Sequence, residues 1–306
     1  MIRRFAYLMF SFVVAACASG GGSAGAPATP QKIAFSGTPN GIAIRDSDGA
    51  VFVTDDKTNG IVMTENIADA SPDFALFARI PAAEGERTSL SQIDFAPNGH
   101  LMVERFGFGT SSAVFDIAPS RQAMLASDTN PARRRLGIEV LDGGTFLSSW
   151  FTKEGNAPAT GGVSVITRGA TPGSVTERDI VTGLGKPVGV VVVGDTLFIS
   201  DQAANRIFKV DLQAARASNE PVQATDVFAT VDSPDLLAAS SDGTLYTKCG
   251  AHAICSFSKR GRATVLASDF DEPRGIAVDG ARKRLVAVDR SSARDKPSAL
   301  RVLPIR

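Results

Sequence analysis

The sequence predicts an all-β protein, folded as a six-bladed β-propeller. The main observation is one pattern that repeats along the chain: an apolar opening strand, a turn, a second strand, a second turn and a third strand. A further β-like segment precedes each opening strand, which makes four strands per repeat. Repeated four-stranded meanders are typical of propellers. The opening strands align on Gly41, Gln92, Gly137, Gly189, Leu236 and Gly275.

Residues 1–16 have the features of an export signal peptide. Arg3 and Arg4 precede an apolar run that ends at Ala16, and this run is too short for a stable membrane span. The placement of Cys17 resembles the bacterial lipoprotein lipobox, in which the cysteine is lipidated and the preceding segment is removed. The alternatives are an ordinary signal peptide with a chance cysteine and, because of the two arginines, twin-arginine export.

Residues 17–30 are expected to be the lipidated cysteine and a flexible tether. The stretch ASGGGSAGAPATP has no large apolar residue and cannot bury enough surface to fold. The propeller would then occupy residues 31–306. We therefore predict an exported protein that a lipid alone anchors in the cell envelope, at the periplasmic or surface face of the outer membrane.

The charge balance argues against nucleic acid as a partner. Removing residues 1–16 takes away two arginines and no acid, which leaves 30 basic residues against 32 acidic ones. Such a balance gives no electrostatic basis for binding a polyanion. The one dense basic run, Arg133 to Arg135, is expected to be an exposed loop.

The clearest repeat lies at residues 186–212. Its three apolar segments are rich in β-branched residues, and Gly194-Asp195 and residues 201–205 supply the turns. The last repeat ends after its third strand, near Ile305, whereas KIAFS precedes the first opening strand. The N-terminal segment is therefore predicted to supply the outer strand of the last blade and to close the ring.

The remaining cysteines, Cys249 and Cys255, flank a predicted turn between two strands. In an oxidising envelope compartment, cysteines that face each other across a hairpin favour a disulfide over a metal pair or a nucleophile. The chain has no C-x-x-C redox motif.

Several repeats resemble known families. An opening P-x-G, a strand that ends in Asp and a following N-R-I resemble NHL repeats, most closely at residues 187–211 and again at 39–63 and 273–289. Pro234-Asp235-Leu236, with the downstream DGTLY, resembles the P-D-G blade of the regucalcin and gluconolactonase family, whose propellers also have six blades. The two resemblances specify the fold better than the activity.

In such propellers, the loops that enter the innermost strands and the loops between the second and third strands lie at one mouth of the channel. By that analogy, polar groups would converge there over an apolar shaft, as a small-molecule site requires. The ligand-binding candidates are Asn40, Ser91, Asp235, Arg274, Trp150 and His252. Further residues expected at the mouth or rim are Glu104, Arg105, Leu136, Phe151, Lys153, Val188 and Arg290.

The resemblance also implies where a metal would bind. Lactonase-type members hold a divalent cation with a first-blade Glu, an Asn from a P-N-G opening and an Asp from a P-D-G opening. Only Asp235 matches: Asn40 stands where the Glu is expected, Val188 replaces the Asn, and Ser91 replaces an Asn that contacts substrate. Asp235 would instead cap a turn or pair with Arg274.

Other catalytic motifs have little support. Two histidines without a G-x-S-x-G elbow argue against a Ser-His-Asp triad, and the chain has neither a P-loop nor a complete dinucleotide fingerprint. Asp55, Asp201 and Asp289 end equivalent strands and are expected to bond to backbone N–H groups of the next turn.

The sequence thus favours a monomeric envelope lipoprotein whose propeller binds a small molecule or an envelope protein, with no cofactor expected. One alternative is a lactonase or ester hydrolase of the gluconolactonase type, which would use Ca²⁺, Mn²⁺ or Zn²⁺ with Asp235 as a ligand. The other is a non-catalytic envelope scaffold. The missing ligand positions weigh against the enzyme.

Overall fold

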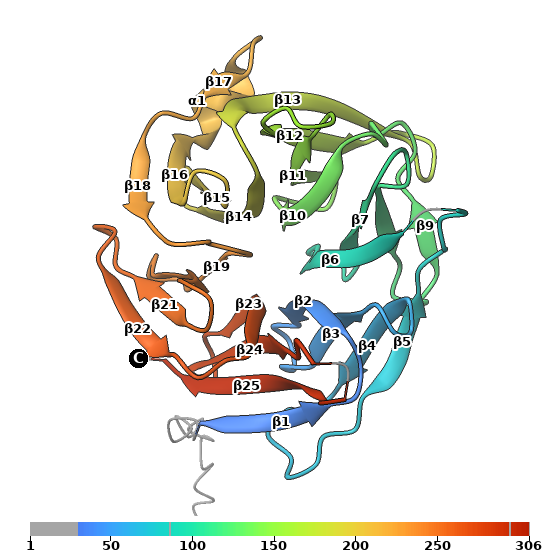
Figure 1. The fold of residues 1–306 in the computed structure, drawn as a ribbon. Coiled ribbons are helices and arrows are strands. Elements are labelled where there is room, and N and C mark those ends of the chain that lie inside the picture. The colour runs from blue at the N-terminus through green and yellow to red at the C-terminus, as the bar shows by residue number, and fades with distance from the viewer. Residues whose placement is uncertain (1–29, 86, 294, 306) are drawn as a thin grey trace, which may run out of the picture.

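The computed structural model describes residues 30–85, 87–293 and 295–305. The predicted signal peptide, Cys17 and the tether lie outside these residues. Within the described residues the fold is a closed ring of six sheets around a central channel, as predicted (Figure 1). No helix in this part of the chain is long and apolar enough to cross a membrane.

The first three blades follow one another along the chain, each numbered from its innermost strand outward. Blade one contains β2 (Pro39–Ile44), β3 (Val51–Asp55), β4 (Gly60–Thr64) and β5 (Ala75–Arg79). Blade two contains β6 (Thr88–Phe95), β7 (Leu101–Gly107), β8 (Ala113–Ile117) and β9 (Ala123–Leu125). Blade three contains β10 (Arg134–Val140), β11 (Thr145–Thr152), β12 (Thr160–Arg168) and β13 (Val175–Leu184).

The other three blades complete the ring. Blade four contains β14 (Pro187–Val193), β15 (Thr196–Asp201), β16 (Arg206–Asp211) and β18 (Val227–Thr230). Blade five contains β19 (Ala238–Ala239), β20 (Leu245–Lys248), β21 (Ile254–Phe257) and β22 (Ala263–Ala267). Blade six contains β23 (Glu272–Asp279), β24 (Arg284–Arg290), β25 (Ser298–Pro304) and β1 (Gln31–Phe35).

The N-terminal strand closes the ring, as the sequence predicts. β1 pairs antiparallel with β25 over its whole length, from Gln31 opposite Val302 to Phe35 opposite Ser298. It therefore covers the outer edge of the last blade, which would otherwise present unpaired backbone groups to solvent. Figure 1 shows the two ends of the described chain meeting in this blade.

One segment departs from the four-strand repeat. Between β16 and β18 the chain forms helix α1 (Leu212–Ala217), and Asp211 caps it by accepting a hydrogen bond from the Ala214 N–H at 2.8 Å. The short strand β17 (Val222–Gln223) then adds in parallel to the outer edge of β13. This segment therefore links blades three and four on the outside of the ring.

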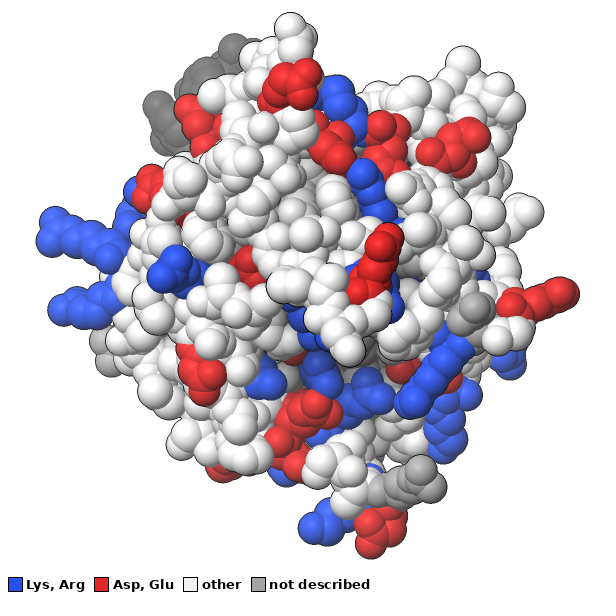
Figure 2. Space-filling model, turned by 45° about the horizontal axis from the view of Figure 1, so that its top comes forward, with Lys and Arg blue, Asp and Glu red and all other residues white. Residues whose placement is uncertain are grey.

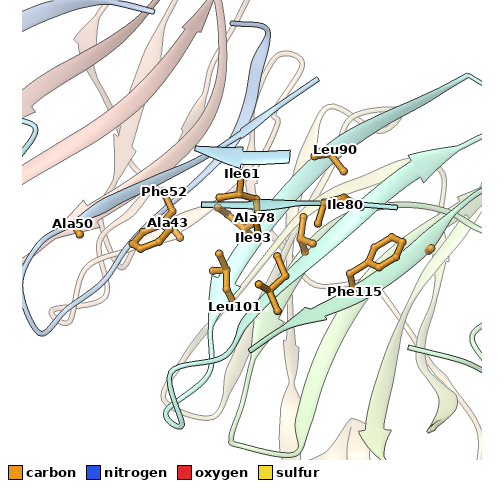
Figure 3. Packing of buried hydrophobic residues seen from close by; sticks show 13 residues of the cluster. Ala43, Ala50, Phe52, Ile61, Ala78, Ile80, Leu90, Ile93, Leu101 and Phe115 are labelled. Carbon is orange, nitrogen blue, oxygen red and sulfur yellow. The ribbon is translucent and has the colours of Figure 1, made fainter. Parts of the chain in front are cut away.

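The core consists of apolar clusters between adjacent blades. In the cluster between blades one and two, the Phe52 ring is fully buried and meets Phe77 and Phe95 edge-on at 5.0 Å and 4.9 Å. Ile61 from β4 and Leu101 from β7 belong to the same cluster (Figure 3). The blades thus face each other through alternate residues of their strands, as the period of two requires.

The innermost strands approach so closely that a side chain would not fit at the aligned glycines. A Cβ on Gly189 would lie 2.4 Å from the backbone nitrogen of Leu237 in the next blade, and one on Gly275 would lie 2.4 Å from the Asn40 carbonyl oxygen. Gly41 and Gly137 are confined in the same way by blades two and four. The repeated glycine is therefore a packing requirement of the ring.

Hydroxyl groups on the second strands join neighbouring blades at these glycines. Ser200 Oγ accepts a hydrogen bond from the Gly189 N–H at 2.7 Å and donates to the Asp235 carbonyl oxygen of the next blade at 2.6 Å. The same two bonds are made by Thr54, between Gly41 and Ser91, and by Ser149, between Gly137 and Val188. These bonds satisfy backbone groups at the free edge of the innermost strands in blades one, three and four.

Two of the three strand-ending aspartates, Asp55 and Asp201, bond to the following turn as predicted, whereas Asp289 accepts, among the described residues, only the Asp271 N–H of the loop entering its blade, at 2.7 Å. Asp201 accepts hydrogen bonds from the Ala203 N–H of the following turn at 3.0 Å and from the Lys186 N–H of the loop entering its blade at 2.9 Å. Asp55 likewise holds the Lys57 and Thr38 N–H groups. Each carboxylate therefore fixes the loop that precedes an innermost strand.

The prediction that Arg133 to Arg135 form an exposed loop is wrong. Arg135 is fully buried and contacts Glu177 at 2.7 Å, while Arg133 contacts Glu177 and Asp179, both at 2.6 Å. These acids lie on β13, more than forty residues further along the chain. In the sequence, this basic run looks solvent-exposed because the acidic residues that pair with it lie far along the chain.

The predicted disulfide is present: Cys249 and Cys255 are bonded across the turn between β20 and β21. The bond closes the hairpin of the blade with the shortest innermost strand, β19.

Replacing Gly189 by alanine tests the close approach of the innermost strands. We expect Gly189→Ala to lower the free energy of unfolding by about 2–3 kcal/mol, because the new methyl group forces the two strands apart. Denaturant unfolding measures this change. Gly280→Ala is the matched control, since a Cβ there meets no atom within 4 Å; equal effects of the two substitutions would contradict the packing argument.

Candidate functional site at the channel mouth

The six innermost strands surround a channel that one side chain crosses. Gln92 of blade two occupies the position held by Gly41 and Gly189 in their blades, and its Nε2 donates to the Leu237 carbonyl oxygen in blade five at 3.5 Å. Gln92 is only 8% exposed and Leu236 only 2%. The middle of the channel is therefore filled by side chains, which separate its two mouths.

Asn40 and Ser91 lie at the predicted mouth but use their side chains to join blades. Asn40 Nδ2 donates to the Leu90 carbonyl oxygen at 2.8 Å, and Ser91 Oγ donates to the Leu136 carbonyl oxygen at 2.6 Å. Ser91 is also buried. Asn40, which is half-buried, retains its amide oxygen for a ligand, whereas Ser91 mainly stabilises the ring.

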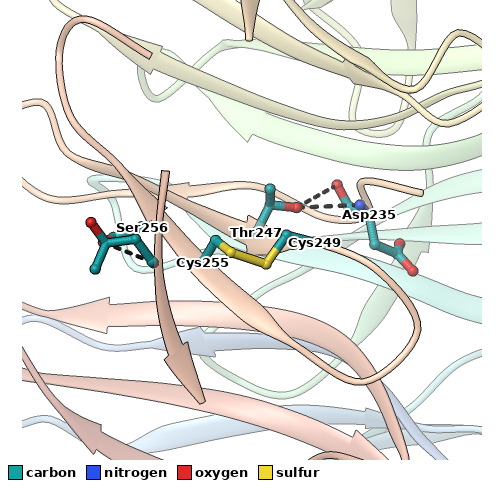
Figure 4. The surroundings of a disulfide bond; sticks show 6 residues. Asp235, Thr247, Cys249, Cys255 and Ser256 are labelled. Atoms are coloured by element: carbon teal, nitrogen blue, oxygen red, sulfur yellow. Dashed lines mark hydrogen bonds between the residues drawn. A yellow bond between two sulfur atoms is a disulfide. The ribbon is translucent and has the colours of Figure 1, made fainter. Parts of the chain in front are cut away.

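Asp235 and Arg274 form the ion pair that the sequence allows. Arg274 Nη1 lies 3.2 Å from Asp235 Oδ2, and its Nη2 contacts Glu272. Asp235 Oδ1 accepts the Leu236 N–H at 3.0 Å, while Thr247 bonds to the Asp235 backbone (Figure 4). Cys249 directly follows the strand that contains Lys248 and Thr247, and Figure 4 shows the disulfide beside Thr247.

The donor set around Asp235 does not fit a divalent cation. Its carboxylate is held by a guanidinium and a backbone N–H, and both are hydrogen-bond donors rather than metal ligands. Among the described residues, no three His, Cys, Asp or Glu side chains come together as a metal site. Val188, at the position of the family's Asn ligand, is buried and apolar.

Trp150 and His252 have other partners. Trp150 Nε1 donates to Ser164 Oγ at 2.8 Å, and the Arg133 guanidinium lies over its ring at 3.8 Å. The exposed His252 contacts the Phe270 and Asp271 carbonyl oxygens through Nδ1, at 3.0 Å and 2.9 Å. Within the described part of the chain, no hydrogen bond or ion pair joins either side chain to Asp235 or Arg274.

Two residues expected at the rim are buried beneath it. Glu104 is fully buried, accepts a hydrogen bond from Ser148 and lies near Arg135; burial raises the pKa of its carboxyl group well above the usual value. Arg105 donates to the Pro81 and Ser111 carbonyl oxygens at 2.6 Å and 2.8 Å. Arg105 therefore holds two loops, whereas Glu104 links blade two to the strands of blade three.

Sequence reasoning missed Lys186, the most informative group at this mouth. Its half-buried ammonium donates to Gln202 Oε1 at 2.6 Å and lies 5.8 Å from the centroid of the Phe151 ring. Burial lowers the pKa of the Lys186 ammonium. The neighbouring cations Arg274, Lys248 and Lys153 lower this pKa further, and only Asp235 opposes them.

The rest of the rim adds aromatic rings and further cations. Arg134 lies over the Phe108 ring at 4.6 Å and over Phe151 at 5.6 Å. Arg290 is 3.9 Å from Asp56, whose carboxylate also accepts the Ser89 hydroxyl at 2.6 Å. Figure 2 shows one face of the molecule, on which Lys and Arg gather below the centre with Asp and Glu among them.

A positional signal for these residues exists in the repeat. The candidates Asn40, Val188 and Arg274 follow the opening prolines of their blades, whereas Lys186 and Glu272 precede them. Arg134 precedes Arg135, which pairs with the second strand at the place of such a proline. Both positions reach the mouth, and both carry charged side chains.

Comparison with known proteins supports the fold alone. No protein-family model matches the chain, and no curated protein sequence matches it. Among solved structures, a gluconolactonase from Xanthomonas campestris is 14% identical with a TM-score of 0.68, and covers 92% of this chain and 91% of its own. A calcium-binding regucalcin from Agrobacterium tumefaciens is 13% identical with a TM-score of 0.63, over 90% and 96%. Virginiamycin B lyase from Staphylococcus aureus is 16% identical with a TM-score of 0.58, over 90% and 99%.

A metal titration tests the donor set at Asp235. We expect millimolar Ca²⁺, Mn²⁺ or Zn²⁺ to leave the Tm unchanged, because a ligand stabilises a protein only when it binds the folded state. Thermal unfolding of the purified protein provides the measurement. A rise in Tm that disappears in Asp235→Ala would show that the carboxylate does hold a cation.

Proposed function

We propose that this protein binds a small anionic molecule at the mouth lined by Lys186, Arg274 and Lys248. The observation that carries the proposal is the half-buried Lys186 ammonium, on which the charges of three cations, Arg274, Lys248 and Lys153, act together with that of one acid, Asp235. Bringing like charges together costs free energy, and a bound anion offsets this cost. A carboxylate or phosphate group suits these donors best.

The neighbouring groups favour an anion that also carries hydroxyl groups. Asp235, Asp56 and the amide oxygen of Asn40 are hydrogen-bond acceptors at the same mouth. Phe151 and Phe108 supply apolar surface beside the cations. Hydroxy carboxylates and sugar acids combine these properties, so we propose them as the ligand class.

A second candidate function is hydrolysis of a lactone or ester, and two observations favour it. Some solved structures that share this fold are gluconolactonases, and hydrolysis of a lactone yields the hydroxy acid that the mouth would bind. In addition, the lowered pKa of Lys186 makes a neutral amine accessible as a general base.

The hydrolytic step would use the chain's own residues. The neutral amine of Lys186 takes a proton from water as the water oxygen attacks the carbonyl carbon, and Arg274 stabilises the resulting oxyanion. The ring C–O bond then breaks, and the leaving oxygen takes the proton back from the lysine. No step passes through a metal, because the groups around Asp235 do not fit one.

We also propose that the protein is exported and lipid-anchored in the cell envelope through Cys17. The Cys249–Cys255 disulfide supports this location, because such bonds persist in oxidising compartments. An envelope protein as the partner, in place of a small molecule, remains the alternative that the exposed rim would serve.

Loss of the Lys186 charge tests anion binding. We expect Lys186→Met to weaken the binding of gluconate by roughly tenfold, about 1.4 kcal/mol, as measured by calorimetry. Affinity of the parent protein should fall as pH rises through the lowered pKa of Lys186, because only the protonated amine attracts the anion. Lys259→Met, at an exposed turn in blade five, is the control. Equal binding of gluconate and neutral glucose would exclude the anion site.

A hydrolysis assay tests the second candidate. If it is correct, gluconolactone disappears faster with protein than without it, and Lys186→Met lowers kcat/KM at least roughly tenfold. EDTA should have no effect. Activity that EDTA abolishes and Ca²⁺, Mn²⁺ or Zn²⁺ restores would contradict the metal-free step.

A further inference from the structure

A second concavity lies at the opposite end of the channel. It has a volume of about 810 Å³ and is lined by the C-terminal halves of the innermost strands and the turns that follow them. Its apolar wall includes Ile93, Val191, Leu237, Ile276 and Val278. A cavity of this size accommodates a small organic molecule.

Two acidic side chains from neighbouring blades face this cavity. Asp94 of β6 and Glu139 of β10 both line it, and the charge of Asp94 acts on the Glu139 carboxyl. Asp94 Oδ2 accepts the Val140 N–H at 2.7 Å, and Glu139 Oε1 accepts the Val192 N–H at 3.0 Å. The two acids therefore occupy equivalent positions in the innermost strands of adjacent blades.

Gln92 supplies an independent indication of a ligand. It is 92% buried, lines the same cavity, and its Oε1 has no hydrogen-bond partner within the described residues. A buried amide oxygen without a donor is costly unless a bound molecule or water satisfies it. Since its Nε2 is directed to Leu237, the free oxygen remains available to a donor in the cavity.

Nearby charges leave the cavity acidic. Besides Asp94 and Glu139, the lining contains Asp46 and Arg45 from the turn after β2. Arg45 is engaged with Asp48 at 2.6 Å and lies over the Phe52 ring at 5.2 Å. Burial raises the pKa of Asp94 to about 7, and the charge of Asp46 adds to this rise. Burial also raises the pKa of Glu139 well above its usual value, and the charge of Asp94 acts in the same direction.

We propose that this cavity is a binding site for a small organic cation, an ammonium group attached to an apolar body. The ammonium would lie between the carboxylates and donate to Gln92 Oε1, while the apolar body would pack against the wall. An inorganic cation fits less well, because among the described residues no third carboxylate, His or Cys comes close enough to Asp94 and Glu139 to share a metal ion.

This site is separate from the anion-binding mouth. Gln92 and Leu236 fill the channel between the two, and no residue named in the proposed anion site lines the second cavity. Failure of either proposal therefore leaves the other intact.

The test is calorimetry on the intact protein with benzylammonium as the probe, compared with the neutral benzyl alcohol and the anionic benzoate. We expect binding of benzylammonium alone. Glu139→Gln should weaken it by roughly tenfold, although the amide keeps the acceptor for Val192 N–H. Glu220→Gln, an exposed acid on the outside of the ring, is the control and should bind like the parent protein.

A second measurement uses the titration of the carboxyls. Benzylammonium stays protonated between about pH 8 and pH 5.5, whereas Asp94 and Glu139 become neutral as the pH falls. The affinity should therefore fall by roughly tenfold or more over this range. Benzyl alcohol binding as tightly as benzylammonium, no binding of either, or unchanged affinity in a folded Glu139→Gln protein would each overturn the proposal.

Discussion

The close approach of the innermost strands is the constraint on which the ring depends. At Gly41, Gly137, Gly189 and Gly275 the neighbouring backbone leaves no room for a Cβ, and hydroxyls such as Ser200 bridge the glycine N–H to the carbonyl of the next blade. An innermost strand has one free edge, and without these bonds its backbone groups would be buried unpaired. Glycine and hydroxyl together let the blades close around a narrow channel.

Blade two departs from this pattern and supplies the side chain that divides the channel. In blade two, Gln92 replaces the glycine and Glu104 stands where other blades have the bridging hydroxyl. Gln92 crosses the channel and divides it, while Ser91 takes over the link to blade three through the Leu136 carbonyl. The side chains that depart from the repeat therefore divide the channel into two separate ends. A regular repeat would leave one uniform channel.

The two ends differ in charge because different positions of the strands face them. Lys186 and Arg274 stand beside the opening prolines and reach one mouth, whereas Asp94 and Glu139 stand near the C-terminal ends of their innermost strands and face the other. Burial lowers the pKa of Lys186 and raises that of Asp94. Groups of like charge held together in a partly buried concavity are typical of binding sites.

The sequence by itself determined the features that depend on neighbouring residues: the repeated strands and turns, the closure by β1, the disulfide and the structural aspartates. Strand alternation and turn chemistry are local, so they can be read along the chain. Only the tertiary structure decided which charged side chains are buried and which charged groups they meet. Arg135 is buried because Glu177 lies on an outer strand of the same blade, and Asp94 meets Glu139 because adjacent blades align equivalent positions. Such pairings depend on distances between remote segments, which a single sequence does not specify.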